Sequence, residues 1–143
     1  MDQAIINFYS ETDFFLEDQE KYISWIVNVI ISESKKVGEI SYIFCDDQYL
    51  LGLNKEYLDH DTFTDIISFD FSVGKIVQGD IFISIERVKE NSVLFNVSFA
   101  EELRRVIIHG ILHLCGYGDK TPEESELMRN KEDEKMELFH VEQ

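Results

Sequence analysis

The chain is poor in the residues that break, cross-link or anchor a fold. It has one proline and two cysteines among 143 residues, and no stretch approaches the ~18 apolar residues that a membrane helix needs. Cys45 and Cys115 lie in apolar segments without C-x-x-C spacing, which predicts reduced core thiols rather than a disulfide framework. Met1-Asp2-Gln3 provides no basic region before an apolar core, so no signal peptide is expected. These features predict a soluble cytoplasmic protein without a membrane partner.

Positive charge is also scarce. Thirteen Lys and Arg face 29 Asp and Glu, which gives a formal net charge of −16. This balance argues against binding nucleic acid or anionic lipid through bulk electrostatics, and favours metal ions or basic partners. The acidity is uneven: residues 1–80 have 5 Lys and Arg against 16 acids, 81–122 have five of each, and 123–143 have 3 against 8. Residues 81–122 are therefore neutral within an acidic chain.

What the chain does have is the composition of one globular domain, 44% hydrophobic and long enough for a single core. Period-2 and helical patterns indicate an α+β fold with about four strands and four or five helices. The strands are expected in the first 85 residues. The patterns predict strands over 5–9, 39–45, 64–71 and 81–84, and helices over 19–35, 47–57, 85–96, 99–115 and 122–138.

Capping residues support several of these boundaries. Gly38 is expected to end the first helix, and Asp46 or Asp47 to cap the second. Ser98 and Glu101 form a capping box for the helix over 99–115. Thr121, Pro122 and Glu124 mark the start of the last helix, whose acidic run 132–134 is interpreted as a solvated face.

Two of the four histidines, His109 and His113, stand four residues apart on the most apolar predicted helix. At that spacing they share one face, with Cβ atoms about 5–6 Å apart. Both imidazoles could then meet one divalent metal at about 2.0–2.1 Å. Glycines 116 and 118 could turn the chain so that Asp119 faces the rings. Spacing alone leaves a second reading open, in which both histidines are hydrogen-bonded core residues.

Gly110 occupies the position that holds the general-base glutamate in H-E-x-x-H peptidases. A zinc peptidase is therefore the least expected function. A glycine there would permit the close approach of another backbone or of a substrate.

Four ordered blocks resemble a known family. The run H-G-I-L-H-L-C-G-Y-G-D over 109–119 is similar to the signature H-G-x-L-H-L-x-G-Y-D-H of the YbeY family, bacterial metal-dependent endoribonucleases of rRNA maturation. L-N-K-E-Y at 53–57, T-D-I-I-S-F at 64–69 and G-D-I at 79–81 follow the family order. The resemblance covers about residues 50–120.

The resemblance implies a mixed sheet of about four strands with a zincin-like metal-binding helix, and one Zn²⁺ at the end of a cleft. His109 and His113 match the first two family ligands, whereas Asp119 stands at the third, a histidine in the family. A carboxylate can bind zinc at about 2.0–2.2 Å. It would make bound water less acidic and favour harder divalent metals. His60, His140 or a water are the alternative third ligands.

A second departure from the family concerns phosphate binding. Leu58 stands where the family usually has an arginine in the cleft, so a bidentate phosphate contact is lost. His60, Lys55 or Lys120 could supply positive charge instead. Arg104 and Arg105 are further candidates, with solvated helix positions as their alternative. The candidates for the substrate groove, each with a local structural role as its alternative, are Thr64, Asp65, His60, Lys55 and Arg105.

The expected function is that of a single-strand-specific metallo-endoribonuclease, in which metal-activated water attacks a phosphodiester. The implied task is maturation of the 3′ end of small-subunit (16S) rRNA and ribosome quality control, with rRNA, the ribosome or ribosomal proteins as partners and no DNA. Leu58 and Asp119 keep an alternative open, a non-catalytic, metal-stabilised ribosome-assembly factor. The acidity predicts weak non-specific RNA binding in either case.

Overall fold

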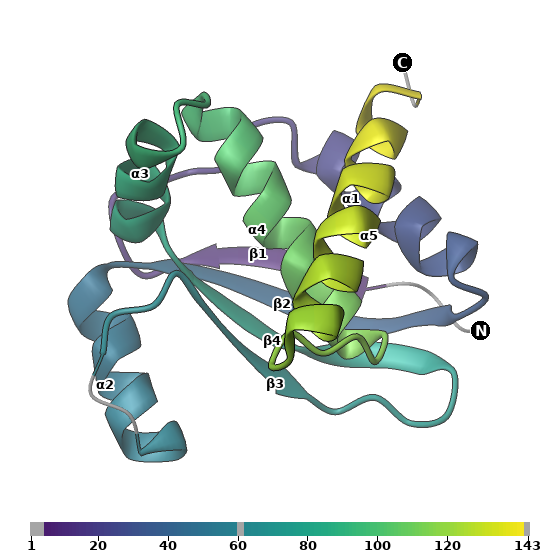
Figure 1. Cartoon of the computed structure of the whole chain (residues 1–143), viewed down its shortest axis with the longest axis horizontal. Coiled ribbons are helices and arrows are strands. Elements are labelled where there is room, and N and C mark those ends of the chain that lie inside the picture. The colour runs from purple at the N-terminus through teal and green to yellow at the C-terminus, as the bar shows by residue number, and fades with distance from the viewer. Residues whose placement is uncertain (1–4, 60–61, 142–143) are drawn as a thin grey trace.

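The computed structural model describes residues 5–59 and 62–141, except for the side chains of 140 and 141. All four of its strands precede residue 85, and three of its five helices follow them (Figure 1), as the sequence predicted. The elements in chain order are β1 (Ile5–Ser10), α1 (Gln19–Ser32), β2 (Lys36–Cys45), α2 (Asp47–Leu58), β3 (Ile66–Asp70), β4 (Ile76–Ser84), α3 (Ile85–Leu94), α4 (Phe99–Leu114) and α5 (Pro122–Val141).

The strands form one mixed sheet in the order β1-β2-β4-β3. β1 and β4 pair with β2 in parallel, whereas β3 pairs with β4 in antiparallel orientation. The expected mixed α+β sheet is thus confirmed. Since β3 has only β4 as a neighbour, it forms one edge of the sheet.

Helix α4 packs against the sheet, with α1 and α5 on the same side (Figure 1). Ile107, Ile108 and Ile111 of α4 are fully buried, and each such side chain stabilises the fold by about 1.5–3 kcal/mol. A Cβ on Gly110 would lie 3.0 Å from the side chains of Ile66 and Ile81. Glycine at this position therefore lets α4 approach β3 and β4 closely, and the approaching groups are strand side chains rather than a substrate.

The opposite face of the sheet has a smaller core. Cys45, Leu50 and Ile67 form a buried cluster there, which joins α2 to β2 and β3. Cys45 and Cys115 are both free thiols, as predicted. None of the described helices combines the length and apolarity needed to cross a membrane.

The expected end of the first helix at Gly38 was wrong. Helix α1 ends at Ser32, and Ser34, with φ 60°, turns the chain into β2, which already begins at Lys36. Gly38 lies inside that strand, where a Cβ would come within 2.7 Å of the Gln78 side chain. The glycine therefore serves a close contact with β4 and not a helix end.

The other predicted caps are present. The side chain of Asp46 accepts a hydrogen bond from the Tyr49 amide at 2.8 Å, and that of Ser98 accepts one from Glu101 at 3.0 Å. Gly116, with φ 111°, follows the end of α4. α4 and the turn after it thus begin and end where the sequence signals lie, which places both histidines in the last turns of the helix.

Candidate metal centre

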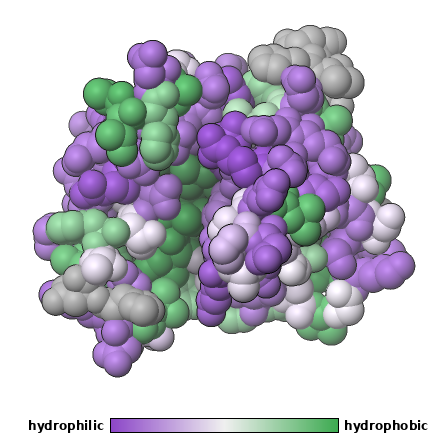
Figure 2. All heavy atoms as spheres, in the orientation of Figure 1, coloured by the Kyte–Doolittle hydropathy of each residue, from purple (hydrophilic) through white to green (hydrophobic). Residues whose placement is uncertain are grey.

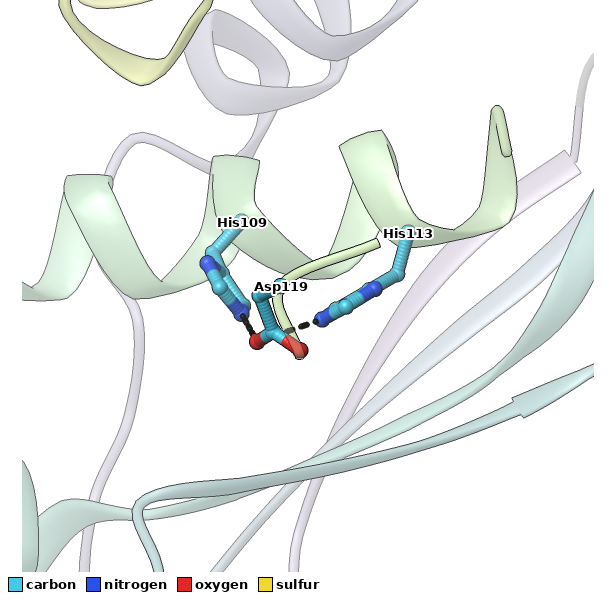
Figure 3. A group of neighbouring side chains, drawn as sticks. All are labelled: His109, His113 and Asp119. Atoms are coloured by element: carbon cyan, nitrogen blue, oxygen red, sulfur yellow. Dashed lines mark hydrogen bonds and ion pairs between the residues drawn. The ribbon is translucent and has the colours of Figure 1, made fainter. Parts of the chain in front are cut away.

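The last two turns of α4 and the loop after Gly116 bring three side chains together. The Nε2 atoms of His109 and His113 lie 3.3 and 3.2 Å from the same oxygen, Oδ2 of Asp119. Figure 3 shows both rings pointing from one helix toward this carboxylate. One ligand atom from each residue lies within 4.8 Å of the others, so this group could hold a metal ion.

These distances fit a tetrahedral ion. Two ligand atoms at about 2.0–2.2 Å from one such ion lie about 3.3–3.5 Å apart, close to the separations of 3.3 and 3.2 Å between each Nε2 and Oδ2. Two histidines and one carboxylate also match a known zinc donor set that leaves a fourth position open. Imidazole and carboxylate donors serve other divalent metals as well. The three residues therefore fit a divalent metal without selecting zinc.

The other ring nitrogens have partners that orient the rings. Nδ1 of His109 lies 2.6 Å from Oε2 of Glu132, and Nδ1 of His113 lies 2.9 Å from the carbonyl oxygen of Tyr117. Both partners can accept a hydrogen bond from Nδ1, as Asp119 can from Nε2, so a metal in place of the Nε2 proton would leave the ring proton on Nδ1. The Nε2 lone pair of each ring is then directed toward Asp119, the arrangement that a metal ligand requires.

Glu132 contradicts the interpretation of 132–134 as a solvated face. Its side chain is 6% exposed and its Oε1 accepts a hydrogen bond from Arg105 Nη1 at 2.9 Å. Only the next two positions of the run are exposed. The spacing of Met128, Glu132 and Lys135, all buried, follows one face of a helix. That period was the sequence signal that could have found Glu132.

Charge in this group is set by competing effects. Burial alone would lower the pKa of His109, but the hydrogen bond to Glu132 and nearby carboxylates outweigh it, and the pKa is raised. Burial alone would raise the pKa of Glu132, but hydrogen bonds from His109 and Arg105 lower it. Glu132 therefore stays ionised and can hold the Nδ1 proton of His109. Burial raises the pKa of Asp65, which lies beside this group.

The loop that carries Asp119 is fixed from the opposite side. The Tyr117 hydroxyl donates to Glu33 Oε1 at 2.7 Å, and Lys135 and Lys131 lie 2.8 and 3.3 Å from Oε2 of the same carboxylate. Burial opposes ionisation of Glu33, but hydrogen bonds from Lys135 and Tyr117 lower its pKa to about 2. Glu33, at the C-terminal cap of α1, thus anchors a loop 84 residues later in the chain.

A cavity of about 580 Å³ opens in front of the two histidines, between β3, the end of α4 and the loop at 119–120. Figure 2 shows a hollow with an apolar floor in this part of the surface. Thr64 and Asp65, two of the residues predicted for a substrate groove, line this cleft, and so do Leu58 and Lys120.

Two other predicted groove residues, Arg105 and Lys55, do not line this cleft. Arg105 lines a neighbouring hollow, where its guanidinium pairs with Glu132 and Asp133 at 2.9 and 2.8 Å. Lys55 is exposed on α2 and is not among the described residues that line the cleft. His60 lies outside the described residues, and so does the side chain of His140. The Arg104 guanidinium lies over the Phe139 ring, 4.8 Å from its centroid.

Comparisons with known proteins identify the family of the chain. The family model described as endoribonuclease YbeY matches residues 5–140. The chain is 60% identical to an endoribonuclease YbeY of Flavobacterium johnsoniae over 97% of this chain and 100% of that protein. It is also 60% identical to one of Christiangramia forsetii over the full length of both. A solution structure of a Thermotoga maritima protein aligns with a TM-score of 0.66 and 26% identity, covering 96% of this chain and 91% of that one. The chain therefore belongs to the YbeY endoribonuclease family.

Proposed function

We propose that this chain is a metal-dependent endoribonuclease that cleaves single-stranded RNA in the cleft beside α4. His109, His113 and Asp119 would hold one divalent ion, either zinc or a harder metal. The observation that carries the proposal is that two imidazole Nε2 atoms, of His109 and His113, each lie within 3.3 Å of one carboxylate oxygen of Asp119, and that all three residues line the cleft. Family membership supplies the RNA substrate class.

The ion, when bound, supplies Lewis acidity toward a phosphoryl oxygen and makes a water more acidic. The chain's own groups orient the reactants. Glu132 and the Tyr117 carbonyl can accept the Nδ1 protons, which would leave both Nε2 atoms to bind the ion. Thr64 and Asp65 contact the RNA next to the scissile phosphate. Lys120 is the one lysine or arginine among the described residues that line the cleft, so it is the side chain available to neutralise a phosphate there.

The biological task proposed is maturation of the 3′ end of small-subunit (16S) rRNA and ribosome quality control in the cytoplasm. The support for this is family membership together with the net charge of −16. An acidic protein is complementary to basic ribosomal proteins. We expect those proteins, rather than a basic surface of this chain, to bring it to its RNA.

Cleavage of a short single-stranded RNA by metal-loaded wild type and His113→Ala tests the proposal. We expect the wild type to cleave, and His113→Ala to lose both metal and at least about 100-fold in rate, since one of three ligands is gone. Tyr9→Ala, a substitution at an exposed residue of β1, is the control and should bind metal and cleave RNA as the wild type does. Cleavage by the wild type without metal, unchanged in His113→Ala, would refute the proposal.

A second candidate is a non-catalytic ribosome-assembly factor in which the metal is structural. Leu58 lines the cleft at the place of a family arginine, and this substitution favours the candidate. If the chain is such an assembly factor, metal-loaded wild type should not cleave RNA. The variant His113→Ala would then show only a lower melting temperature.

A further inference from the structure

The strand that borders the cleft, β3, has no second strand on its outer edge in the part of the chain that the structure describes. The Asp65 carbonyl accepts from the Ser84 amide at 2.9 Å, and the Phe71 amide donates to the Gln78 carbonyl at 3.0 Å. Both residues therefore face β4. Because alternate residues of an antiparallel edge strand face opposite ways, the backbone N–H and C=O groups of Ile66 and Ser68 point away from the sheet. The Ile66 carbonyl accepts a hydrogen bond from the Thr64 hydroxyl at 3.4 Å.

This edge forms a wall of the cleft. Ile67 lines the cleft although its side chain is 4% exposed and belongs to the buried cluster on the opposite face of the sheet. The cleft must therefore meet the backbone of β3 at this residue. Ile66 and Ser68, on either side of it, line the cleft as well.

Charge along the cleft disfavours phosphates near β3. Apart from the proposed metal ligand Asp119, the cleft is lined by Asp65 and Asp70 at the two ends of β3, against one lysine, Lys120, among the described residues. An RNA backbone lying along β3 would be repelled by these carboxylates. Bases have hydrogen-bond donors and acceptors without a net charge, so they suit this wall better than phosphates do.

The spacing of the outward groups fits unstacked bases. Alternate residues of a strand are about 6.6–6.8 Å apart, twice the 3.4 Å rise per base in one strand of a duplex. Successive outward groups of β3 therefore cannot match stacked neighbours, but can match bases splayed from an extended single strand, the form in which RNA base edges are accessible.

We propose that the outer edge of β3 recognises bases: the N–H of Ile66 and the N–H and C=O of Ser68 hydrogen-bond to base edges of a single-stranded RNA whose phosphate lies at His109, His113 and Asp119. This proposal rests on the proposed function, and it adds that the protein recognises the bases of its RNA substrate. It also gives a reason for preferring single strands, because paired bases would have their Watson–Crick edges occupied.

A proline scan of the two sheet edges tests this. Ser68→Pro removes one outward N–H, and proline is tolerated on edge strands where the N–H faces solvent. Ser10→Pro is the matched control, on the opposite edge. The amide of Glu11, the next residue, donates to the Phe44 carbonyl at 2.7 Å, so the Ser10 amide points away from β2. Ser68→Ala separates the loss of the hydroxyl from the loss of the N–H.

Binding is measured for metal-loaded proteins with a phosphorothioate-linked single-stranded RNA and with an abasic strand of equal charge. We expect Ser68→Pro to weaken binding of the base-containing RNA about three- to tenfold, as for one hydrogen bond. Ser10→Pro should bind as wild type, and Ser68→Ala should lose less than Ser68→Pro. The effect of Ser68→Pro should vanish on the abasic strand.

Equal binding by Ser68→Pro and Ser10→Pro would overturn the proposal. So would equal affinity of the wild type for abasic and base-containing strands, a comparison that decides the matter if Ser68→Pro does not fold. A third outcome would also overturn the proposal. If Ser68→Pro weakened the binding of an extended peptide but not of RNA, the edge of β3 would instead bind a protein by strand addition. In each case RNA cleavage by the wild type would persist, whereas failure of the proposed function would abolish cleavage itself.

Discussion

The two sides of the histidine pair differ in how their polar groups are partnered. On the α5 side, Glu132 is held by Arg105 and His109, and Glu33 by Lys131, Lys135 and Tyr117. On the β3 side, the backbone edge and the carboxylates of the cleft face an open cavity of about 580 Å³. The difference teaches that the two imidazoles of the proposed metal site are held by α5 and the loop before it, while the side toward β3 is open.

The α5 side contains ionised groups that are largely buried. Buried ions are unfavourable unless they are paired and hydrogen-bonded, and the α5 side satisfies this with two linked ion-pair groups. Outer partners of metal-binding histidines fix ring orientation and affect metal affinity by about 10- to 100-fold. The comparison is therefore testable by weakening the α5 side while leaving the cleft unchanged.

The largest expected effect concerns Glu33 and acid stability. A pKa near 2 in the fold, against an ordinary value of 4.5, means that the ionised form stabilises the fold above pH 4.5. This stabilisation, at most about 3 kcal/mol, is lost as the pH falls from 4.5 toward 2. We expect Glu33→Gln to lower the free energy of unfolding at pH 7 and to flatten its decline in that range, measured by urea unfolding. If the free energy of unfolding of Glu33→Gln fell between pH 4.5 and 2 as steeply as that of the wild type, the role given to Glu33 would be contradicted.

The next effect concerns Glu132 and metal affinity. Glu132→Gln keeps the shape but removes the charge that holds the Nδ1 proton of His109. We expect metal affinity, measured by chelator competition, to fall about 10- to 100-fold. Glu137→Gln is the control, an exposed position on the same helix, and should leave the affinity unchanged. Equal affinities in the two variants would show that the α5 side does not orient the ligands.

The smallest effect concerns the loop anchor. Tyr117→Phe removes the hydroxyl that donates to Glu33 at 2.7 Å and leaves the carbonyl that accepts from His113. Loss of one hydrogen bond to a charged group costs about 1.5–3 kcal/mol, and only part of that loss reaches the metal site through the loop. We expect a two- to fivefold loss of metal affinity, with Tyr57→Phe, an exposed tyrosine (60%), as the control. A loss as large as that of Glu132→Gln would mean that Tyr117 contributes more than an anchor.

The sequence predicted the parts of the fold that depend on local patterns. The spacing of His109 and His113, the cap at Ser98 and the turn at Gly116 are local, and the structure has each of them in place. The prediction that Gly38 ends the first helix was wrong because this glycine serves a contact with Gln78, which lies on another strand. The structure brings Asp119 to the rings, which the glycines made possible but could not specify.

The partners that orient the site were beyond such patterns. Glu33 and Tyr117 are 84 residues apart, and only the packing of α1 against α5 brings the Glu33 network together. Glu132 lies in a strongly acidic segment, where its burial was masked by exposed neighbours. Family resemblance pointed to the ligand positions and the strand at 64–69, but not to these outer partners.

Metal titration of metal-free protein, followed by both binding and RNA cleavage, tests the central claim most directly. Zn²⁺ is added in steps, and bound ion and the rate of cleavage of a single-stranded RNA are measured on the same samples. We predict that the rate rises in proportion to bound metal and saturates at one ion per chain, and that Asp119→Ala shows neither tight binding nor cleavage. Full cleavage before metal is added, or saturation that is unchanged in Asp119→Ala, would contradict the account.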